Sequence, residues 1–433
     1  FAVVSSLFLY HQSAKLNSYL LQKYAYYIDT IIKSAILIPN SQVQKTTVRL
    51  SEMRFAFDPS AYDTATNLIS HLKYTLHSKI SDKQAFGVFY LLSSLLKSNP
   101  NVCESQYNEI IDALEIFFND HAVENYLIFL PDLLDCLNPS IIHCEDRIFK
   151  IVFYKEVLSS KIENCQNISK IMKYLPNKFC PHINEKCFQL ALVAQDCYFL
   201  LMKSVIQYMP TIVDRQFVLG TFKKLKFTSY MVDTAVLFAH TYISEIFQFI
   251  HIFVPKITNL NIDSLRFLSE ISFLSEFPLI DYWDMVYDCF LNESKEIHIA
   301  SIPALTSIIQ RFKQQEQKTK LFSLLFSVQD DSSEVKLAFL NSINDSLLPL
   351  FVSPDLFFII QELYQDEDFE VSKSVISLIT RIGKISPLTT LPFFHKKLDQ
   401  FQDFFFQIPA KTEQKHFLKS LPIIISGSGR IVV

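Results

Sequence analysis

A repeated unit of helices, of which Leu356–Lys397 is the clearest copy, constrains this chain more than any other feature of its sequence. The unit reads as an apolar helix, the acidic turn Asp366-Glu367-Asp368, an amphipathic helix, a stop at Ser386-Pro387 and a third helix. Carboxylates at a helix start accept the free backbone N–H groups, and the residue before proline is pushed out of the helical region. One such unit cannot bury its own apolar face, so it needs a copy on each side. The apolar stripe consists of Val371, Val375, Ile376, Leu378, Ile379 and Ile382.

Two earlier copies precede this unit. Glu334 and Glu370 are 36 residues apart (370 − 334), and Glu296 precedes Glu334 by 38 residues (334 − 296). The weakest match is Ser301, which stands where the later copies have Phe339 and Val375. Two helices per repeat of this length are typical of HEAT or armadillo proteins, so we predict an all-α solenoid of helical hairpins. The structural repeat positions are Glu296, Ile297, Asp331, Glu334, Val335, Phe339, Asp368, Phe369, Glu370, Val371, Val375, Ile379, Arg381, Pro387 and Pro392.

The predicted domain organisation is a single HEAT-type superhelix over residues 1–433, with its clearest repeats at 291–433. Regular hairpins are expected at 1–160 and 186–433, and an irregular hinge or insertion at 161–185, where asparagines and two prolines interrupt the pattern. The chain begins at Phe1 rather than at a methionine and ends at Val433 inside an apolar run. We therefore interpret it as a fragment of a longer chain.

The composition supports this fold and excludes several function classes. Hydrophobic residues make up 49% of the chain, which excludes a fully disordered protein. Only 5 glycines are present, which disfavours phosphate-binding loops and Rossmann folds. The net charge of −4 gives no electrostatic footprint for nucleic acid. The eight cysteines are irregularly spaced and indicate reduced thiols in an intracellular protein. The apolar stretch Ala235–Val254 carries His240, Glu245 and His251, so we interpret it as two buried helices and expect no membrane span.

The repeat residues resemble the N-terminal HEAT region of the target of rapamycin (TOR) kinases, which belong to the phosphatidylinositol-3-kinase-related family. Residues 321–433 carry the resemblance, although Ser386 replaces an asparagine and a Phe-rich run at 401–406 replaces a Leu-rich one. The matching segments are Phe369-Glu370-Val371, Arg381-Ile382, Ser386-Pro387, Leu391-Pro392-Phe393-Phe394-His395-Lys396, Lys411-Thr412-Glu413-Gln414 and Gly429-Arg430-Ile431.

This resemblance implies a non-catalytic scaffold segment of a serine/threonine kinase in growth and nutrient signalling. Its implied partners are an adaptor subunit and a second copy of the parent chain, and its implied location is the cytoplasm, with the nucleus or a membrane surface reached through partners. No cofactor is implied, and no kinase catalytic motif occurs in this segment. We expect Arg381 and the turn acids to support packing, so that Arg381→Ala lowers the thermal stability.

Several alternatives remain open at this point. The first is a free-standing HEAT-repeat adaptor or a karyopherin-like transport protein. The second is an enzyme with a site in 161–200, built on a zinc ion at Cys180, His182 and Cys187 or on perturbed carboxylates. His143-Cys144 could join such a zinc site, but the spacing fits no familiar zinc motif.

Three further motifs have structural explanations that we prefer. The loop at 426–430 lacks the Gly-Lys-Ser/Thr ending of a phosphate loop and is better explained as a helix–helix turn. The acidic turns at 330–331 and 366–368 are better explained as helix N-caps than as a cation site. The phenylalanines at 404–406 are expected in the core, or at an interface if they are exposed.

Overall fold

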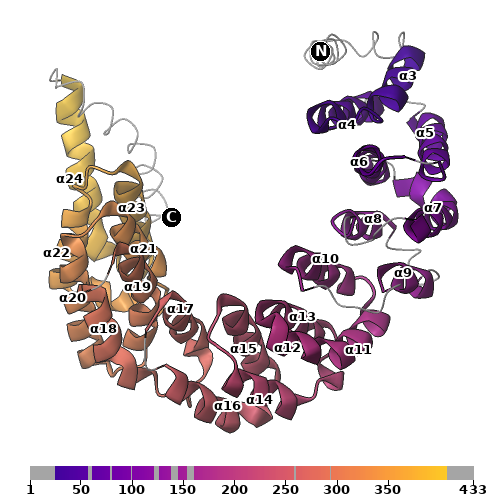
Figure 1. Ribbon diagram of the computed structural model, residues 1–433. Helices are drawn as coiled ribbons and strands as arrows, with labels where there is room; N and C mark the ends of the chain where they lie inside the picture. Colours follow the sequence, from indigo (N-terminus) through magenta and orange to yellow (C-terminus); the bar gives the residue numbers. More distant parts are fainter. Residues whose placement is uncertain are drawn as a thin grey trace. The chain divides into compact units, whose positions relative to one another are not determined.

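The described residues of the computed structural model form helices and turns and contain no β-strand (Figure 1). The prediction of an all-α solenoid of helical hairpins is therefore confirmed. The structure describes residues 25–56, 61–78, 80–98, 100–120, 126–137, 145–153, 160–257, 260–292 and 294–406.

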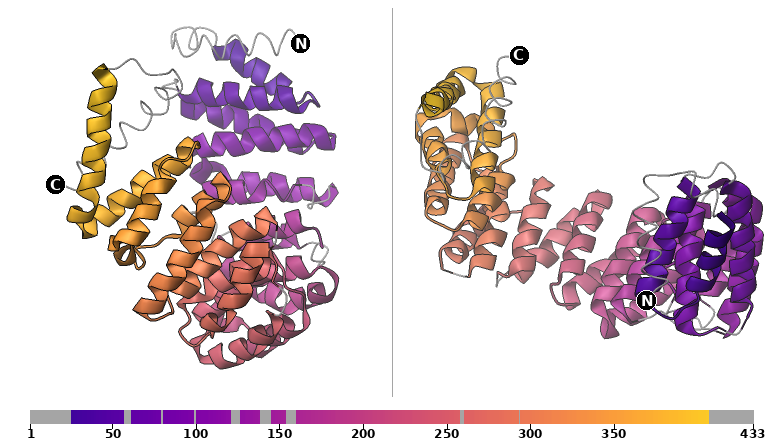
Figure 2. Two further views of the ribbon diagram at one scale, coloured as in Figure 1. Left: turned by 90° about the vertical axis from the view of Figure 1, so that its left-hand side faces the viewer. Right: turned by 90° about the horizontal axis from the view of Figure 1, so that it is seen from above.

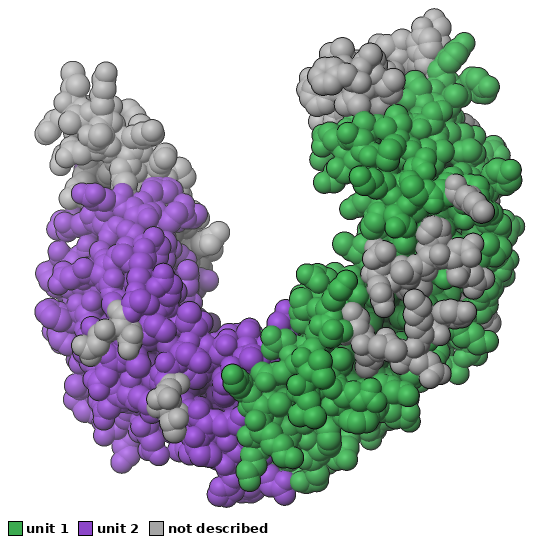
Figure 3. Space-filling model, viewed as in Figure 1, with its two compact units in different colours: residues 1–226, 233–245 green, residues 227–232, 246–433 purple. Residues whose placement is uncertain are grey.

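The chain divides into two compact units, which Figure 3 colours separately. Unit 1 comprises residues 1–226 and 233–245, and unit 2 comprises residues 227–232 and 246–433. The change from one unit to the other therefore lies at 227–245. The hinge or insertion predicted at 161–185 is not where the units divide. The single continuous superhelix stays a prediction.

In unit 1 successive helices form two rows, and each helix packs against its counterpart in the next hairpin (Figure 2). One row contains α4 (Ser41–Ala56), α6 (Asp82–Ser98), α8 (Leu130–Leu137), α10 (Ile162–Met172) and α13 (Gln195–Tyr208). The other contains α3 (Ala25–Ala35), α5 (Ala61–Leu76), α7 (Pro100–Asp120), α9 (Glu145–Val152) and α11 (Pro176–Lys186). The remaining elements are η3 (Cys187–Gln189), α12 (Leu190–Val193), η4 (Pro210–Ile212), α14 (Arg215–Lys224), η5 (Ile243–Glu245) and most of α15 (Ser229–Thr241).

The segment 161–185, where the sequence predicts a hinge or insertion, holds α10 and most of α11, which are helices of the two rows. Pro176 stands in the first turn of α11, where its missing N–H costs nothing. Pro181 lies inside α11, and the helix continues through it to Lys186. Pro176 therefore marks the start of a helix and Pro181 a position inside it, and neither proline ends the helix.

In unit 2 the same hairpin pattern continues. The row that carries the predicted repeat contains α17 (Ile262–Glu270), α19 (Lys295–Ile309), α21 (Ser333–Ser342) and α23 (Phe369–Ile385). The accompanying helices are α18 (Trp283–Asn292), α20 (Gln314–Gln329), α22 (Pro354–Leu363) and α24 (Pro387–Phe406). Shorter elements are α16 (Ile246–Phe253), η6 (Val254–Lys256), η7 (Ile271–Phe273), η8 (Leu279–Tyr282) and η9 (Leu348–Val352).

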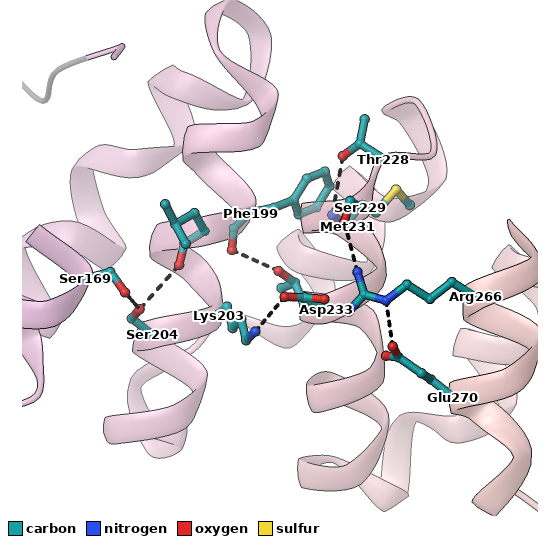
Figure 4. Close-up of polar contacts among 12 residues, drawn as sticks. Ser169, Phe199, Lys203, Ser204, Thr228, Ser229, Met231, Asp233, Arg266 and Glu270 are labelled. Carbon is teal, nitrogen blue, oxygen red and sulfur yellow. Dashed lines mark hydrogen bonds and ion pairs between the residues drawn. The ribbon is translucent and has the colours of Figure 1, made fainter. Parts of the chain in front are cut away.

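Polar side chains link each hairpin to the next at about one repeat length. In unit 1, Ser169 of α10 hydrogen-bonds Ser204 of α13, and Lys203 pairs with Asp233 of α15 at 2.7 Å (Figure 4). The bonded residues are 35 and 30 positions apart in the chain. In unit 2, Arg266 of α17 donates to Ser229, 37 positions earlier, at 2.9 Å (Figure 4). Within α17 the same arginine also donates to Glu270 at 2.6 Å. Such nearest-neighbour links are what a repeat fold requires, because each repeat contacts only the repeats beside it.

No single described helix is long and apolar enough to cross a membrane. One pair, Ser229–Thr241 with Ile243–Lys256, meets the length and composition criteria only together, and the two parts are bent by 106°. The stretch Ala235–Val254 thus lies in two separate helices, as the sequence predicts.

Candidate functional site

The predicted repeat positions form the packed row of unit 2. Val335 and Phe339 of α21, and Val371, Val375 and Ile379 of α23, are completely buried. Each pair of equivalent positions faces the neighbouring helix, because α19, α21 and α23 pack in series. Two positions of the first copy differ. Ile297 is only half-buried, and Ser301, the weak match in sequence, is buried in the row that Phe339 and Val375 occupy in later copies.

The turns before these helices are joined by a series of polar contacts that we call the turn ladder, consisting of Lys295–Glu334, His298–Asp331 and Lys336–Asp366. Each contact joins one hairpin to the next, at N···O distances of 2.9, 3.1 and 2.7 Å respectively. The turn acids therefore hold neighbouring repeats together, which supports the packing role predicted for them.

Asp366 is the most enclosed acid of the turn ladder. Its carboxylate accepts hydrogen bonds from Lys336 at 2.7 Å, from Ser333 at 3.2 Å and from its own turn, through the Asp368 N–H, at 2.9 Å. Burial by itself would raise the pKa of this carboxyl, but the hydrogen bonds from Lys336 and Asp368 outweigh it and lower the pKa. Asp366 is therefore an ionised structural group that bridges two hairpins.

Helix capping is divided unevenly among the predicted acids. Asp368 is the N-cap of α23 and accepts from the Glu370 N–H at 2.8 Å, as predicted. The N-cap prediction for 330–331 is wrong, because Ser332 occupies the N-cap position of α21. Asp331 instead accepts from the Ser332 N–H and faces His298 of the preceding hairpin. A carboxylate one residue before the cap can reach across to the next repeat, which local sequence does not reveal.

The remaining repeat positions lie at the surface of unit 2. Glu296, Glu334, Glu370, Pro387 and Pro392 are exposed, whereas Asp331, Asp368, Phe369 and Arg381 are half-buried. Pro387 begins α24 directly after Ser386 ends α23, as the proline stop predicts. Pro392 falls inside α24. Arg381 pairs with Asp345 of the previous repeat at 2.8 Å.

Exposed phenylalanines on α20 and α22 were missed by the sequence interpretation. Phe322 and Phe326 of α20 are 40% and 60% exposed, and Phe358 of α22 is 61% exposed. The inner face of α20 already holds buried apolar residues, Leu321 and Leu325 among them. Apolar residues on both faces of one helix are the signal that could have indicated a contact surface. The side chains of the phenylalanines at 404–406 are not among those that the structure describes. His143-Cys144 and the loop at 426–430 also lie outside the described residues.

The residues proposed for an enzyme or zinc site do not form a reactive cluster where the structure describes them. Cys180 and Cys187 are fully buried, and burial raises the pKa of each thiol to about 12. A buried thiol of this kind is not a nucleophile at neutral pH. Among the residues that the structure describes, no group of three His, Cys, Asp or Glu side chains is placed to hold a metal ion.

Comparisons with solved structures show which known folds this chain is similar to. The chain aligns with a chain of the Kap95:Nup1 complex over 96% of its length, with a TM-score of 0.50 and 13% identity. It also aligns with yeast importin-beta (Kap95p) over 97%, with a TM-score of 0.49 and 12% identity, and with Kap121p bound to the SUMO protease Ulp1p over 98%, with a TM-score of 0.44 and 11% identity. The chain has a karyopherin-type HEAT-repeat fold.

The alignments cover 53% of the Kap95 chains and 55% of the Kap121p chain, so this chain spans about half the length of the structures it matches. No protein-family model matches the sequence. No curated protein matches it either.

The predicted relationship to TOR kinases is wrong: the match with a TM-score of 0.50 is to a chain of the Kap95:Nup1 complex, and none of the structures reported above is a TOR kinase. The residues that suggested it are an acidic helix start, a proline stop and an arginine near a helix end. Each meets a physical need at the ends of any helical hairpin, so the same residues recur in unrelated HEAT solenoids.

Proposed function

We propose that this chain is a protein-binding solenoid of the karyopherin type, which moves protein partners between cytoplasm and nucleus. The observation that carries the proposal is the structural similarity to the Kap95 chain of the Kap95:Nup1 complex over 96% of this chain. That protein binds Nup1, and its likeness to this chain is one of fold. The proposal replaces a scaffold role in a kinase and agrees with the karyopherin-like alternative considered from the sequence.

Two features of the described surface support a binding role over a catalytic one. Phenylalanines stand exposed on α20 and α22, two helices that pack against each other, with Phe326 and Phe358 at 60% and 61% exposure. Large exposed apolar side chains that gather on a surface are typical of protein contact sites. The buried thiols and the bridged carboxylates described above are structural, and their environments favour unreactive forms.

Nuclear entry of the fluorescently labelled chain into permeabilised cells tests this proposal. We expect the chain, at 50.3 kDa, to enter nuclei several times faster than an inert globular protein of the same mass. An excess of unlabelled chain should slow the entry, because a carrier competes for a limited number of binding sites. Entry at the rate of the inert protein would refute a transport role and leave a HEAT-repeat adaptor as the better description.

A further inference from the structure

A cavity of about 620 Å³ lies where α20 and α22 begin, in unit 2. Residues from the start of α20 line one side, and residues from η9 and the start of α22 line the other. The lining residues that matter here are Lys313, Gln314, Gln315, Lys318, Leu350 and Ser353. None of them belongs to the repeat positions or to the turn ladder, so the packing of the repeats leaves their function open.

The helix starts at this cavity lack the caps that helices normally have. The N-cap residue of α20 is Lys313, whose side chain has no acceptor and makes no cap hydrogen bond. The N-cap residue of α22 is Ser353, an ordinary capping residue, but its hydroxyl makes no cap hydrogen bond either. The Ser353 Oγ is buried and has no hydrogen-bond partner among the described residues. The cavity therefore presents unsatisfied donors and the positive ends of two helices.

The charged side chains that line the cavity are both lysines, Lys313 and Lys318. Two acids lie close by. Asp355 approaches Lys318 at 3.6 Å and is 68% exposed, so this contact is a loose surface ion pair. Glu316 lies in the first turn of α20 and is exposed. Among the described residues Lys313 has no ion pair, and the positive ends of two helices add to its charge, so the cavity favours a carboxylate.

Three exposed phenylalanines continue the surface beyond the cavity. Phe322 and Phe326 follow Lys318 along α20, and their rings stack with centroids 6.5 Å apart. The Lys318–Asp355 contact sets the register between α20 and α22, which pack against each other. Phe358 follows Asp355 by three residues along α22, as Phe322 follows Lys318 by four residues along α20, and both phenylalanines are exposed. The cavity and the aromatic patch of Phe322, Phe326 and Phe358 thus form one surface on two neighbouring helices.

From the cavity and the adjoining aromatic patch we infer that this surface binds an extended protein segment in which an acidic residue is followed by apolar residues. The acid occupies the cavity beside Lys313 and Lys318, and the apolar side chains pack on the phenylalanines. The inference goes beyond the transport function and does not depend on it.

The dimensions define the spacing of the segment. Along α20, Phe322 and Phe326 lie about 6 Å and about 12 Å beyond Lys318, at 1.5 Å per residue. An extended chain covers those distances in about two and about four residues, and side chains of alternate residues point to the same side. The segment is therefore an acidic residue with apolar residues two and four positions later.

The test measures, by fluorescence anisotropy, how a fluorescein-labelled peptide, Gly-Glu-Ser-Leu-Ser-Leu-Ser, binds to the whole chain. We expect saturable binding that weakens as salt is raised, since a charge pair contributes. Replacing the glutamate of the peptide by glutamine, or both leucines by serine, should weaken binding by about tenfold or more. Absence of binding up to about 1 mM peptide would overturn the inference.

Variants of the chain locate the site. Lys313→Gln/Lys318→Gln and Phe326→Ser should each weaken binding by about tenfold, and all three positions are at the surface or half-buried, so folding is preserved. Matched controls carry the same kinds of change in unit 1: Lys223→Gln/Lys224→Gln for the lysines, and Phe217→Ser, at 42% exposure, for the phenylalanine. The controls should bind as the native chain does. Equal weakening by controls and site variants would overturn the assignment.

Discussion

At the scale of single residues, two ion pairs of similar length differ in what surrounds them. Lys336–Asp366 and Arg381–Asp345 both join neighbouring repeats, at 2.7 and 2.8 Å. The side chains of the first pair are 14% and 10% exposed, whereas those of the second are 33% and 89% exposed. A shielded pair is costly to break because one charge is left without a partner, whereas an exposed pair contributes little.

We predict that Asp366→Asn lowers the free energy of unfolding of unit 2 by about 1–3 kcal/mol at pH 7, because Lys336 then faces a neutral amide. Arg381→Ala should lower it by less than about 1 kcal/mol. Urea unfolding followed by the fluorescence of Trp283, the single tryptophan, measures both. A larger loss for Arg381→Ala would contradict the role of burial.

The effect of Asp366→Asn should also depend on pH. The pKa of Asp366 is lower in the folded chain than its ordinary value of 3.8, so the folded chain binds this proton less readily than the unfolded chain. The stabilisation is complete above that ordinary value and is lost as pH falls through the folded pKa. The difference between the native chain and Asp366→Asn should therefore shrink below pH 3.8. A difference that grows in acid would have the wrong sign for this bridge.

At the scale of elements, a glycine permits a close helix contact in unit 1. A Cβ added at Gly87 of α6 would lie 2.3 Å from the Ile36 carbonyl oxygen and 2.6 Å from the Gln44 amide nitrogen. The Gln44 amide donates to the Ile36 carbonyl at 3.3 Å and to the Lys83 carbonyl at 2.7 Å. The backbone of α6 thus approaches the corner between α3 and α4 too closely for any side chain. Gly220 of α14 has open space around it.

We predict opposite results for the same change at these two helical glycines. Gly87→Ala should destabilise the chain by about 1–3 kcal/mol, because the methyl group forces apart a packed contact. Gly220→Ala should stabilise it by about 0.5–1 kcal/mol, because alanine is the better helix former and meets no neighbour. Thermal unfolding followed by circular dichroism gives both melting temperatures. If Gly87→Ala melts at or above the native temperature, α6 can move away from the corner at no cost.

Sequence predicted the elements better than it predicted the contacts between them. The helices α22, α23 and α24 begin and end close to where the acidic turn and Ser386-Pro387 indicate. Those signals are local, because a cap or a proline acts on the adjacent turn of backbone. The partners of Asp331 and Asp366 are about 30 residues away, and which turn residue faces them depends on how two hairpins stack.

At the scale of the whole molecule, a solenoid distributes its stability among nearest neighbours. The repeat row of unit 2 illustrates this arrangement, because α21 packs against α19 on one side and against α23 on the other. Phe339 is completely buried in that row. Damage to one repeat should therefore be felt by adjacent repeats and fade beyond them.

Hydrogen exchange of Phe339→Ala tests that expectation. Removing this ring should cost about 3–5 kcal/mol locally, and amide exchange should accelerate in α19, α21 and α23. Exchange in α4, α5 and α6 should stay at the native rate. Equal acceleration in both sets of helices would mean that the chain unfolds as one cooperative body.

The sequence by itself determined that this protein is a stack of helical hairpins, because the 36-residue spacing, the apolar stripes and the helix stops are properties of neighbouring residues. It did not determine the family, because hairpin ends in any HEAT solenoid need similar residues. Only the tertiary structure decided which acids cap a helix and which bridge two repeats, why Gly87 must lack a side chain, and that Lys318 and Ser353 line one cavity. The bridges, the close contact at Gly87 and the cavity each join residues 30 or more positions apart, and the packing of one hairpin on the next brings them together.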